Sequence, residues 1–288
     1  MWISLSLFCA LFFSVSDVFS KIAVRRIAPD GVAWARYVFC APMLLVLAPF
    51  SRPPSSWRLF LLYMACALPL ELVAAVLYSN ALKRSPLSLT APFLAFTPVC
   101  ILLTGWIFLG EKPGAAGIAG VLLVAAGAYV LSLGAQPAGV LGPFKNFARE
   151  PGSVMMLGVA VLFAFTATLG KSMIQVSSPL FQAWSYNLAM SVVMTFYLRW
   201  KQPRANYRAL CLQGVLWGAG AFWALMNVFH VLAISVAQAA YMMSLKRTSL
   251  LFSVLFGLWL FREGGVAHRL PGAVLMLCGV VVLAVAGG

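Results

Sequence analysis

Long apolar stretches recur along the whole chain, and they restrict its fold more than any other feature. A helix needs roughly 20 residues to cross a hydrocarbon core of about 30 Å. Only 9% of the 288 residues are charged, whereas soluble domains contain about 25%. The sequence therefore excludes a soluble enzyme and predicts an all-α integral membrane protein with ten transmembrane helices. These lie near residues 2–20, 31–50, 57–80, 86–109, 114–133, 152–170, 180–199, 209–231, 236–260 and 267–286.

The two halves of the chain repeat one another. A shift of 152 residues superposes identical residues in the later part of each half, and a shift of 150 does so in the earlier part. Because Lys, Glu, Pro and Trp are uncommon inside membrane spans, such matches indicate a duplication. The pairs are Ala81 with Ala233, Gly105 with Gly257, Glu111 with Glu263, Gly120 with Gly272, Gly127 with Gly279, Phe13 with Phe163, Lys21 with Lys171, Pro29 with Pro179, and Trp34 with Trp184.

Each half holds five predicted spans, so the second half must enter the membrane in the opposite sense to the first. We expect two inverted five-helix repeats around a central cavity, at residues 1–134 and 152–288, with residues 135–151 as the linker. Inverted repeats are typical of secondary transporters, because mirrored halves can expose a midplane site to either side in turn.

The repeated tracts GWIFLGEKPGAAGIAGVLLVAAGAYVLS and GLWLFREGGVAHRLPGAVLMLCGVVVLAV resemble the drug/metabolite transporter superfamily, in particular its ten-helix EamA branch. The lysine that ends the first span of each half fits the same pattern. The second tract departs from it, since Arg262-Glu263 stands where the first has Gly110-Glu111. The short loops and the Trp and Tyr content resemble the YddG-like exporters of amino acids.

The resemblance implies a secondary exporter of small metabolites that works by alternating access in the cell inner membrane. Amino acids, including aromatic ones, are the expected substrates. Organic phosphates or nucleotide sugars, and multidrug export, stay open as alternatives from the same superfamily.

Ionisable side chains within the predicted spans are candidates for function, because a charge near the bilayer centre costs a few kcal/mol. Lys246 and Arg247 stand together in the middle of the ninth span. In one interpretation they bind an anionic group of the substrate, a carboxylate or a phosphate. In the other they only pair with Glu71 and join helices. The Lys-Arg pair also resembles the phosphate-contacting pair of the organic-phosphate and nucleotide-sugar branches.

Two acidic residues are candidates for coupling. Glu71 lies inside the third span and is a possible proton carrier, because burial disfavours a charged carboxylate while a nearby cation favours it. Its alternative role is a permanent ion pair with the ninth span. Asp17, in the first span, is either a second coupling residue or a partner for Arg36 or for Lys21, four residues further on. Lys171 matches Lys21 across the repeat, which favours a symmetric role in helix closure over substrate contact.

The resemblance implies that the third, eighth and ninth spans line the central cavity. An amphipathic amino acid needs apolar walls with a few directed polar groups. Taken singly, a Trp or Tyr in a membrane helix more often packs or anchors at the interface. We expect His230 at the interface and Met242 and Met243 in the core. The candidate substrate-binding residues on these spans are Tyr78, Asn80, Trp223, Asn227, Tyr241 and Ser244.

Prolines recur along the fourth span, at Pro86, Pro92 and Pro98. Each removes a backbone donor and loosens the helix around it. This pattern predicts either a helix that bends when access changes or a plain kinked scaffold.

The sequence lacks the motifs that are typical of other classes of protein. There is no HExxH or GxSxG motif and no repeated filter sequence, which argues against an enzyme and against a channel. No nucleotide-binding motif is present, so we expect no cofactor. The expected partners are a small-molecule substrate and the lipid bilayer, with a monomer as the working unit. The cysteines lack metal-ligand spacing and are expected to be small buried hydrophobes; they are Cys9, Cys40, Cys66, Cys100, Cys211 and Cys278.

The 20 Lys and Arg against 6 Asp and Glu could suggest binding to nucleic acid. Most basic residues, however, lie in the connections between spans, which membrane topology explains better. The connections after odd-numbered spans hold most of them, and those after even-numbered spans hold only Arg52, Arg58, Lys112 and Lys171. The charge rule therefore predicts both termini outside the cytoplasm, whereas the resemblance implies both inside.

Overall fold

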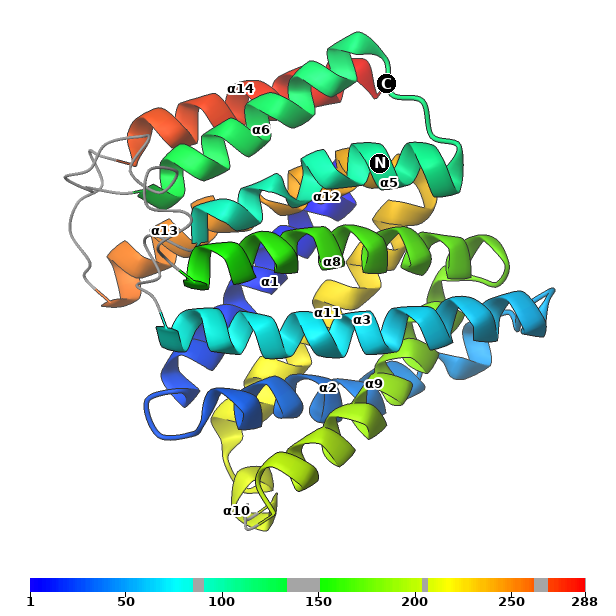
Figure 1. Ribbon diagram of the computed structural model, residues 1–288, viewed down its shortest axis with the longest axis vertical. Helices are drawn as coiled ribbons and strands as arrows, with labels where there is room; N and C mark the ends of the chain where they lie inside the picture. Colours follow the sequence, from blue (N-terminus) through cyan, green and yellow to red (C-terminus); the bar gives the residue numbers. More distant parts are fainter. Residues whose placement is uncertain (85–90, 134–150, 204–206, 262–268, 288) are drawn as a thin grey trace.

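The structure, a computed structural model, describes residues 1–84, 91–133, 151–203, 207–261 and 269–287. These residues form helices, with no strand among them (Figure 1). The helices are α1 (Trp2–Ala23), α2 (Pro29–Leu45), η1 (Ala48–Phe50), α3 (Trp57–Arg84), η2 (Ala91–Phe96), α5 (Thr97–Leu109), α6 (Ala115–Leu133), α8 (Pro151–Gln175), α9 (Pro179–Lys201), α10 (Tyr207–Cys211), α11 (Gly214–Val236), α12 (Ala239–Lys246), α13 (Ser249–Phe261) and α14 (Leu270–Ala286).

Within the described ranges, 6 helical segments are long and apolar enough to cross a membrane. They are α1, α3 as far as Tyr78, the segment Pro92–Leu109, α6, α8 and α11. Of the other predicted spans, α2 and α14 have 17 residues each, and α9 carries polar residues along its length. A multi-pass membrane protein follows from these helices.

Several helices begin at the prolines of the sequence. Pro29, Pro98, Pro179 and Pro271 stand in the first turn of α2, α5, α9 and α14, where a missing N–H costs nothing. Pro98 was expected to loosen the fourth span, and it instead stands at the start of its regular part. Pro92 lies in the 3₁₀ turn η2, and Pro86 lies outside the described residues.

The ninth predicted span is not one continuous helix. It is broken into α12 and α13, with Arg247 and Thr248 between them. The fourth span changes from η2 to α5 between Phe96 and Thr97, and Phe96 is the residue that the 152-residue shift places on Thr248. The regular α-helix is therefore interrupted at equivalent positions of the fourth and ninth spans.

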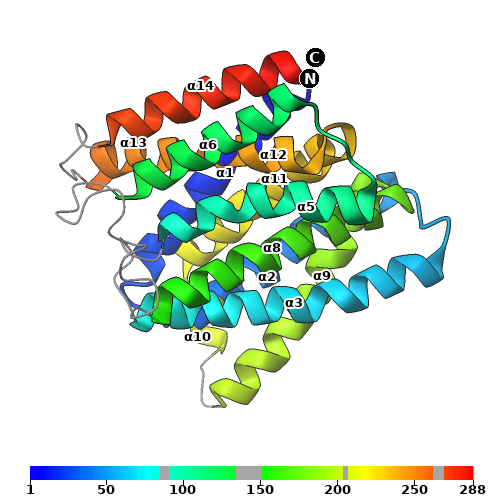
Figure 2. The ribbon, with the colours of Figure 1, turned by 45° about the horizontal axis from the view of Figure 1, so that its top comes forward.

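The helices α6 and α14 pack side by side along their length (Figures 1 and 2). A Cβ added at Gly127 would overlap the backbone of α14, and one at Gly272 would overlap the backbone of α6. Small residues permit this approach, as is usual between membrane helices. Elsewhere α1 packs on α11, α3 on α8, and α2 on α9.

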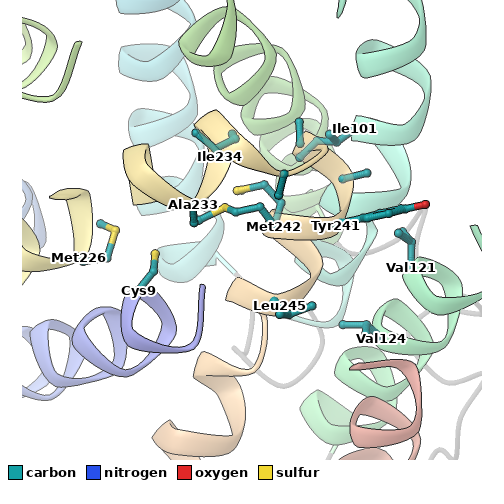
Figure 3. Close-up of a cluster of buried hydrophobic side chains, with 14 of the residues drawn as sticks. Cys9, Ile101, Val121, Val124, Met226, Ala233, Ile234, Tyr241, Met242 and Leu245 are labelled. Carbon is teal, nitrogen blue, oxygen red and sulfur yellow. The ribbon is translucent and has the colours of Figure 1, made fainter. Parts of the chain in front are cut away.

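The buried core lies where α1, α11 and α12 meet α5 and α6 (Figure 3). Met242 and Met243 are buried there, as expected. Cys9 and Cys40 are also buried, and no cysteine forms a disulfide. The expectation was wrong for Cys66, Cys211 and Cys278, which are exposed; on a membrane helix an apolar thiol can face lipid instead of the core.

Candidate functional site

Lys246 and Arg247 lie at the break between α12 and α13. Lys246 is the last residue of α12 and Arg247 is its C-cap. A cation at this position is favoured by the partial negative charge of the helix C-terminus. The Lys246 Nζ lies over the ring of Phe13 in α1, 5.2 Å from its centroid.

Neither cation forms an ion pair with a carboxylate in the part of the chain that the structure describes. Lys246 lies close enough to Glu71 and Asp17 to interact with them electrostatically, but it bonds to neither. Among the described residues Glu71 forms no ion pair with the ninth span, and the choice between its two predicted roles stays a prediction. The Nε of Arg247 is buried and has no hydrogen-bond partner among the described residues.

Glu71 is held by a hydroxyl group. The Tyr37 hydroxyl on α2 donates to Glu71 Oε1 at 3.1 Å, whereas the hydroxyl of the nearby Thr166 on α8 donates to Phe163 O at 3.3 Å. Tyr186 on α9 is near enough to interact electrostatically. The carboxyl group thus lies between three neighbouring helices, in reach of the charge of Lys246 but not bonded to it.

Asp17 and Arg36 form an ion pair, which is the partner that the sequence suggested for Arg36. The Arg36 Nε also donates to the Ser20 hydroxyl at 2.9 Å. The guanidinium lies over the ring of Trp223, 5.0 Å from its centroid. Tyr78 is near enough to interact electrostatically with this pair and with Arg247.

Trp223 forms the apolar wall of the cluster. Its ring packs against Phe13 at 5.9 Å and meets Tyr37 edge-on at 5.8 Å. Its Nε1 is buried and has no hydrogen-bond partner among the described residues. Since buried N–H groups are nearly always paired, two such donors in one cluster require an explanation. We define the charged cluster as Asp17, Arg36, Glu71, Tyr78, Trp223, Lys246 and Arg247.

Other predicted site residues do not join the charged cluster. The Asn80 amide donates to Val76 O, and the Ser244 hydroxyl donates to Ala240 O, so each bonds within its own helix. Asn227 donates to Trp223 O and accepts from the Asn187 amide at 3.3 Å, which places it behind Trp223. Tyr241 is buried against α6, where its hydroxyl lies next to Gly117.

His230, which we expect at the membrane interface, lies within α11, whose last residue is Val236. Its Nδ1 is buried without a hydrogen-bond partner among the described residues, and it lies close enough to Lys246 for an electrostatic interaction. His230 follows Trp223 by two helical turns, so both point from one face of α11. The sequence placed it at the end of its span, where an interfacial position is the usual one.

Among the described residues, no three His, Cys, Asp or Glu side chains gather in a way that could hold a metal ion. A hollow of about 300 Å³ lies between α3 and α9 and is almost wholly apolar, with Trp57, Phe60, Phe181 and Trp184 among its lining. None of the charged cluster lines it, so it offers no polar group to a charged solute.

A second charged contact escaped the sequence analysis. Glu111, in the connection from α5 to α6, accepts from Lys171 Nζ on α8 at 2.5 Å. It also accepts from the backbone N–H of Ala239, the first residue of α12, at 2.9 and 3.1 Å. Lys171 donates in addition to Ala237 O. The signal was the glutamate that recurs at the same point of each half; its second copy, Glu263, lies outside the described residues.

Comparisons with known proteins give a family, related sequences and a shared fold. The profile of the EamA-like transporter family matches residues 1–133. An uncharacterized transporter in the cobO 3′ region of a Sinorhizobium species is 31% identical over 140 residues, which is 46% of this chain and 96% of that protein. A WAT1-related protein of Arabidopsis thaliana is 30% identical over 99 residues, 32% of this chain and only 28% of that protein. One protein of known crystal structure has the same fold, with a TM-score of 0.75 at 14% identity, over 99% of this chain and 97% of that one.

Proposed function

Because the chain belongs to the EamA-like transporter family, we propose that it is a secondary transporter that exports small metabolites, most of all amino acids including aromatic ones. The proposal places it in the cell inner membrane and assigns it alternating access. The observation that carries it is the charged cluster, in which Lys246 and Arg247 have no carboxylate partner among the described residues. A buried cation is costly unless an anion meets it, and the carboxylate of an amino acid supplies one.

The aromatic walls of the cluster support a substrate with a flat apolar part. Phe13 lies under Lys246 and Trp223 under Arg36, and Tyr37 packs on Trp223. The unpartnered Nε1 of Trp223 can donate to an oxygen atom of the substrate. Apolar walls with a few directed donors are usual in small-molecule sites. The break between α12 and α13 favours the same position, since interrupted helices form the midplane sites of many carriers.

The proposal includes ten transmembrane helices in two inverted five-helix repeats, at residues 1–134 and 152–288, joined by residues 135–151 around a central cavity. The packing supports it, because repeat-related helices exchange partners. α8 is the counterpart of α1, and α11 is the counterpart of α3; α1 packs on α11, and α8 packs on α3. The counterparts α2 and α9 pack on one another, and so do the counterparts α6 and α14. A two-fold relation between the halves requires this pattern of contacts.

Counterflow in proteoliposomes tests the function. Purified protein is reconstituted with unlabelled phenylalanine inside, and uptake of labelled phenylalanine is followed. A carrier gives saturable uptake that internal substrate accelerates. Uptake that is linear with concentration, or insensitive to internal substrate, would sink the proposal.

A second candidate substrate class is organic phosphates or nucleotide sugars, since two adjacent cations also suit a phosphate. The same liposomes, loaded with a hexose phosphate or a nucleotide sugar, decide between them. Multidrug export is a third outcome. In that case a hydrophobic cation inside the liposomes would accelerate uptake.

The orientation of the termini is open to a direct measurement. An even number of spans puts both ends on one side; the charge rule puts that side outside the cytoplasm, and the family resemblance puts it inside. A reporter that fluoresces only in the cytoplasm, fused after Gly288, gives bright cells in the second case and dark cells in the first.

A further inference from the structure

The short helix α12 connects the two charged regions of the molecule. It runs for 8 residues, from Ala239 to Lys246, which corresponds to about 12 Å. Glu111 binds the N–H of its first residue, and Lys246 of the charged cluster is its last residue. A helix of two turns that is packed along its length moves as one body, so a displacement at one end reaches the other.

The contact at the N-terminus of α12 joins residues that are distant in the sequence. Glu111 belongs to the N-terminal half, whereas Lys171, Ala237 and Ala239 belong to the C-terminal half. Both side chains are nearly buried, with 11% of Lys171 and 12% of Glu111 exposed. The carboxylate also faces the partial positive charge of the helix N-terminus. We call this contact the Glu111 bridge.

Tyr241 holds the same end of α12 against α6. It points from α12 toward Val121 of α6, whereas Met242 points back toward Ala233 (Figure 3). Its hydroxyl group fills the space above Gly117, where an added Cβ would overlap it. A socket that only glycine provides therefore fixes the position of this helix end.

The connection from α5 to α6, which carries Glu111, lies at the end of the bundle where both termini lie (Figure 2). Trp2, the first residue of α1, packs on Tyr241 at 6.3 Å between ring centroids, and its Nε1 donates to Gly287 O at 3.2 Å. The bridge is thus displaced along α12 from the charged cluster toward one face of the membrane.

We propose that the Glu111 bridge is the closed gate of the carrier on the side of the termini, and that α12 couples its opening to the substrate bound at Lys246 and Arg247. The proposal rests on the carrier function proposed above. Substrate that neutralises the cations moves the C-terminal end of α12, and the N-terminal end must then leave Glu111. Glu111 is a positioning residue in this scheme, since it touches no substrate.

Thiol labelling tests the gate without any transport. All six native cysteines are replaced by alanine, and Ser244→Cys supplies one buried thiol on α12 between the bridge and Lys246. A membrane-impermeant maleimide is applied from the side of the termini. We expect slow labelling with the bridge intact and labelling at least about tenfold faster in the double variant Glu111→Gln/Lys171→Met, which leaves no unpaired charge and should fold.

Matched controls come from the same connection and the same helix. Lys112→Gln removes the neighbouring, exposed charge and should leave the labelling rate unchanged. Gly117→Ala should speed labelling by displacing Tyr241, whereas Gly114→Ala, whose Cβ would meet no atom within 4 Å, should not. A double variant labelled at the original rate would overturn the gate, and so would labelling that rises equally from both faces.

Counterflow then separates this proposal from the carrier function. The gate predicts that the double variant keeps its KM for amino acid within about twofold while its maximal exchange rate falls at least about tenfold. Counterflow by the unmodified protein with unchanged exchange in the double variant would overturn the gate alone. If the unmodified protein gives no counterflow with any substrate, the carrier function fails and the coupling to substrate fails with it, whatever the labelling rates are.

Discussion

The two ends of α12 carry buried charges in opposite situations. At its N-terminal end Glu111 and Lys171 neutralise one another, and backbone groups of Ala237 and Ala239 complete their hydrogen bonds. At its C-terminal end, Lys246 and Arg247 have no carboxylate partner among the described residues. A charge that the protein satisfies itself contributes to structure or to gating, whereas a charge that it leaves unsatisfied requires a ligand.

The largest expected effect comes from breaking the satisfied end. Lys171→Met leaves Glu111 nearly buried without its cation, which should cost about 3–5 kcal/mol of stability. The melting temperature of the purified protein in detergent should fall by several degrees. The double variant Glu111→Gln/Lys171→Met should recover most of that loss. A double variant that melts as low as the single one would mean that the charge is not what stabilises this end.

Removing charge at the unsatisfied end should change binding instead. Arg247→Gln should fold normally and lose about tenfold to a hundredfold in affinity for an amino acid, because a charge-assisted hydrogen bond contributes about 1.5–3 kcal/mol. Affinity for the corresponding carboxamide should not change. Lys246→Gln should behave differently and lose expression or stability, because it removes the cation that faces the C-terminus of α12 and lies over the ring of Phe13.

Binding of phenylalanine and phenylalaninamide to both variants measures this difference. If acid and amide weaken equally in each variant, these cations do not bind the carboxylate, and the substrate site lies elsewhere.

Two tryptophan variants test the same contrast between an unpaired and a paired polar group, with smaller expected effects. Trp223→Phe keeps a ring beside Phe13 and Tyr37 but removes an N–H that has no partner in the described chain. It should lower substrate affinity by about two- to tenfold, as expected for one hydrogen bond of about 0.5–1.5 kcal/mol. Trp34→Phe is the control, because its Nε1 donates to the Thr195 hydroxyl at 2.9 Å. It should lower the melting temperature and leave affinity unchanged; the reverse pattern would contradict the assignment of Trp223.

The smallest effect on exchange is expected at Glu71, because its hydroxyl partner Tyr37 can also donate to the oxygen of an amide. If Glu71 carries the coupling proton, Glu71→Gln should leave counterflow within about twofold and abolish uptake driven by a pH gradient. Both are measured in the same proteoliposomes. Loss of both, together with loss of folded protein, would assign Glu71 a structural role.

Local patterns in the sequence were enough for the membrane class and for most of the helices. Apolar length alone predicts α1, α3, α6, α8 and α11, because crossing a bilayer depends on the composition of one segment. The prolines that start α2 and α9 act within one turn. The repeat also placed Lys246 and Arg247 in the interior, since their counterparts Leu94 and Ala95 lie in the middle of an apolar span.

Which polar groups are satisfied was decided by the tertiary structure alone. Ser244 and Asn80 looked like cavity residues, yet each bonds to a carbonyl of its own helix. Glu111 looked like a helix end, yet its partners lie 60 and 128 residues away. A side chain's membrane depth follows from its own segment, but its hydrogen-bond partner depends on which helices pack together, and a single segment carries no information about that contact.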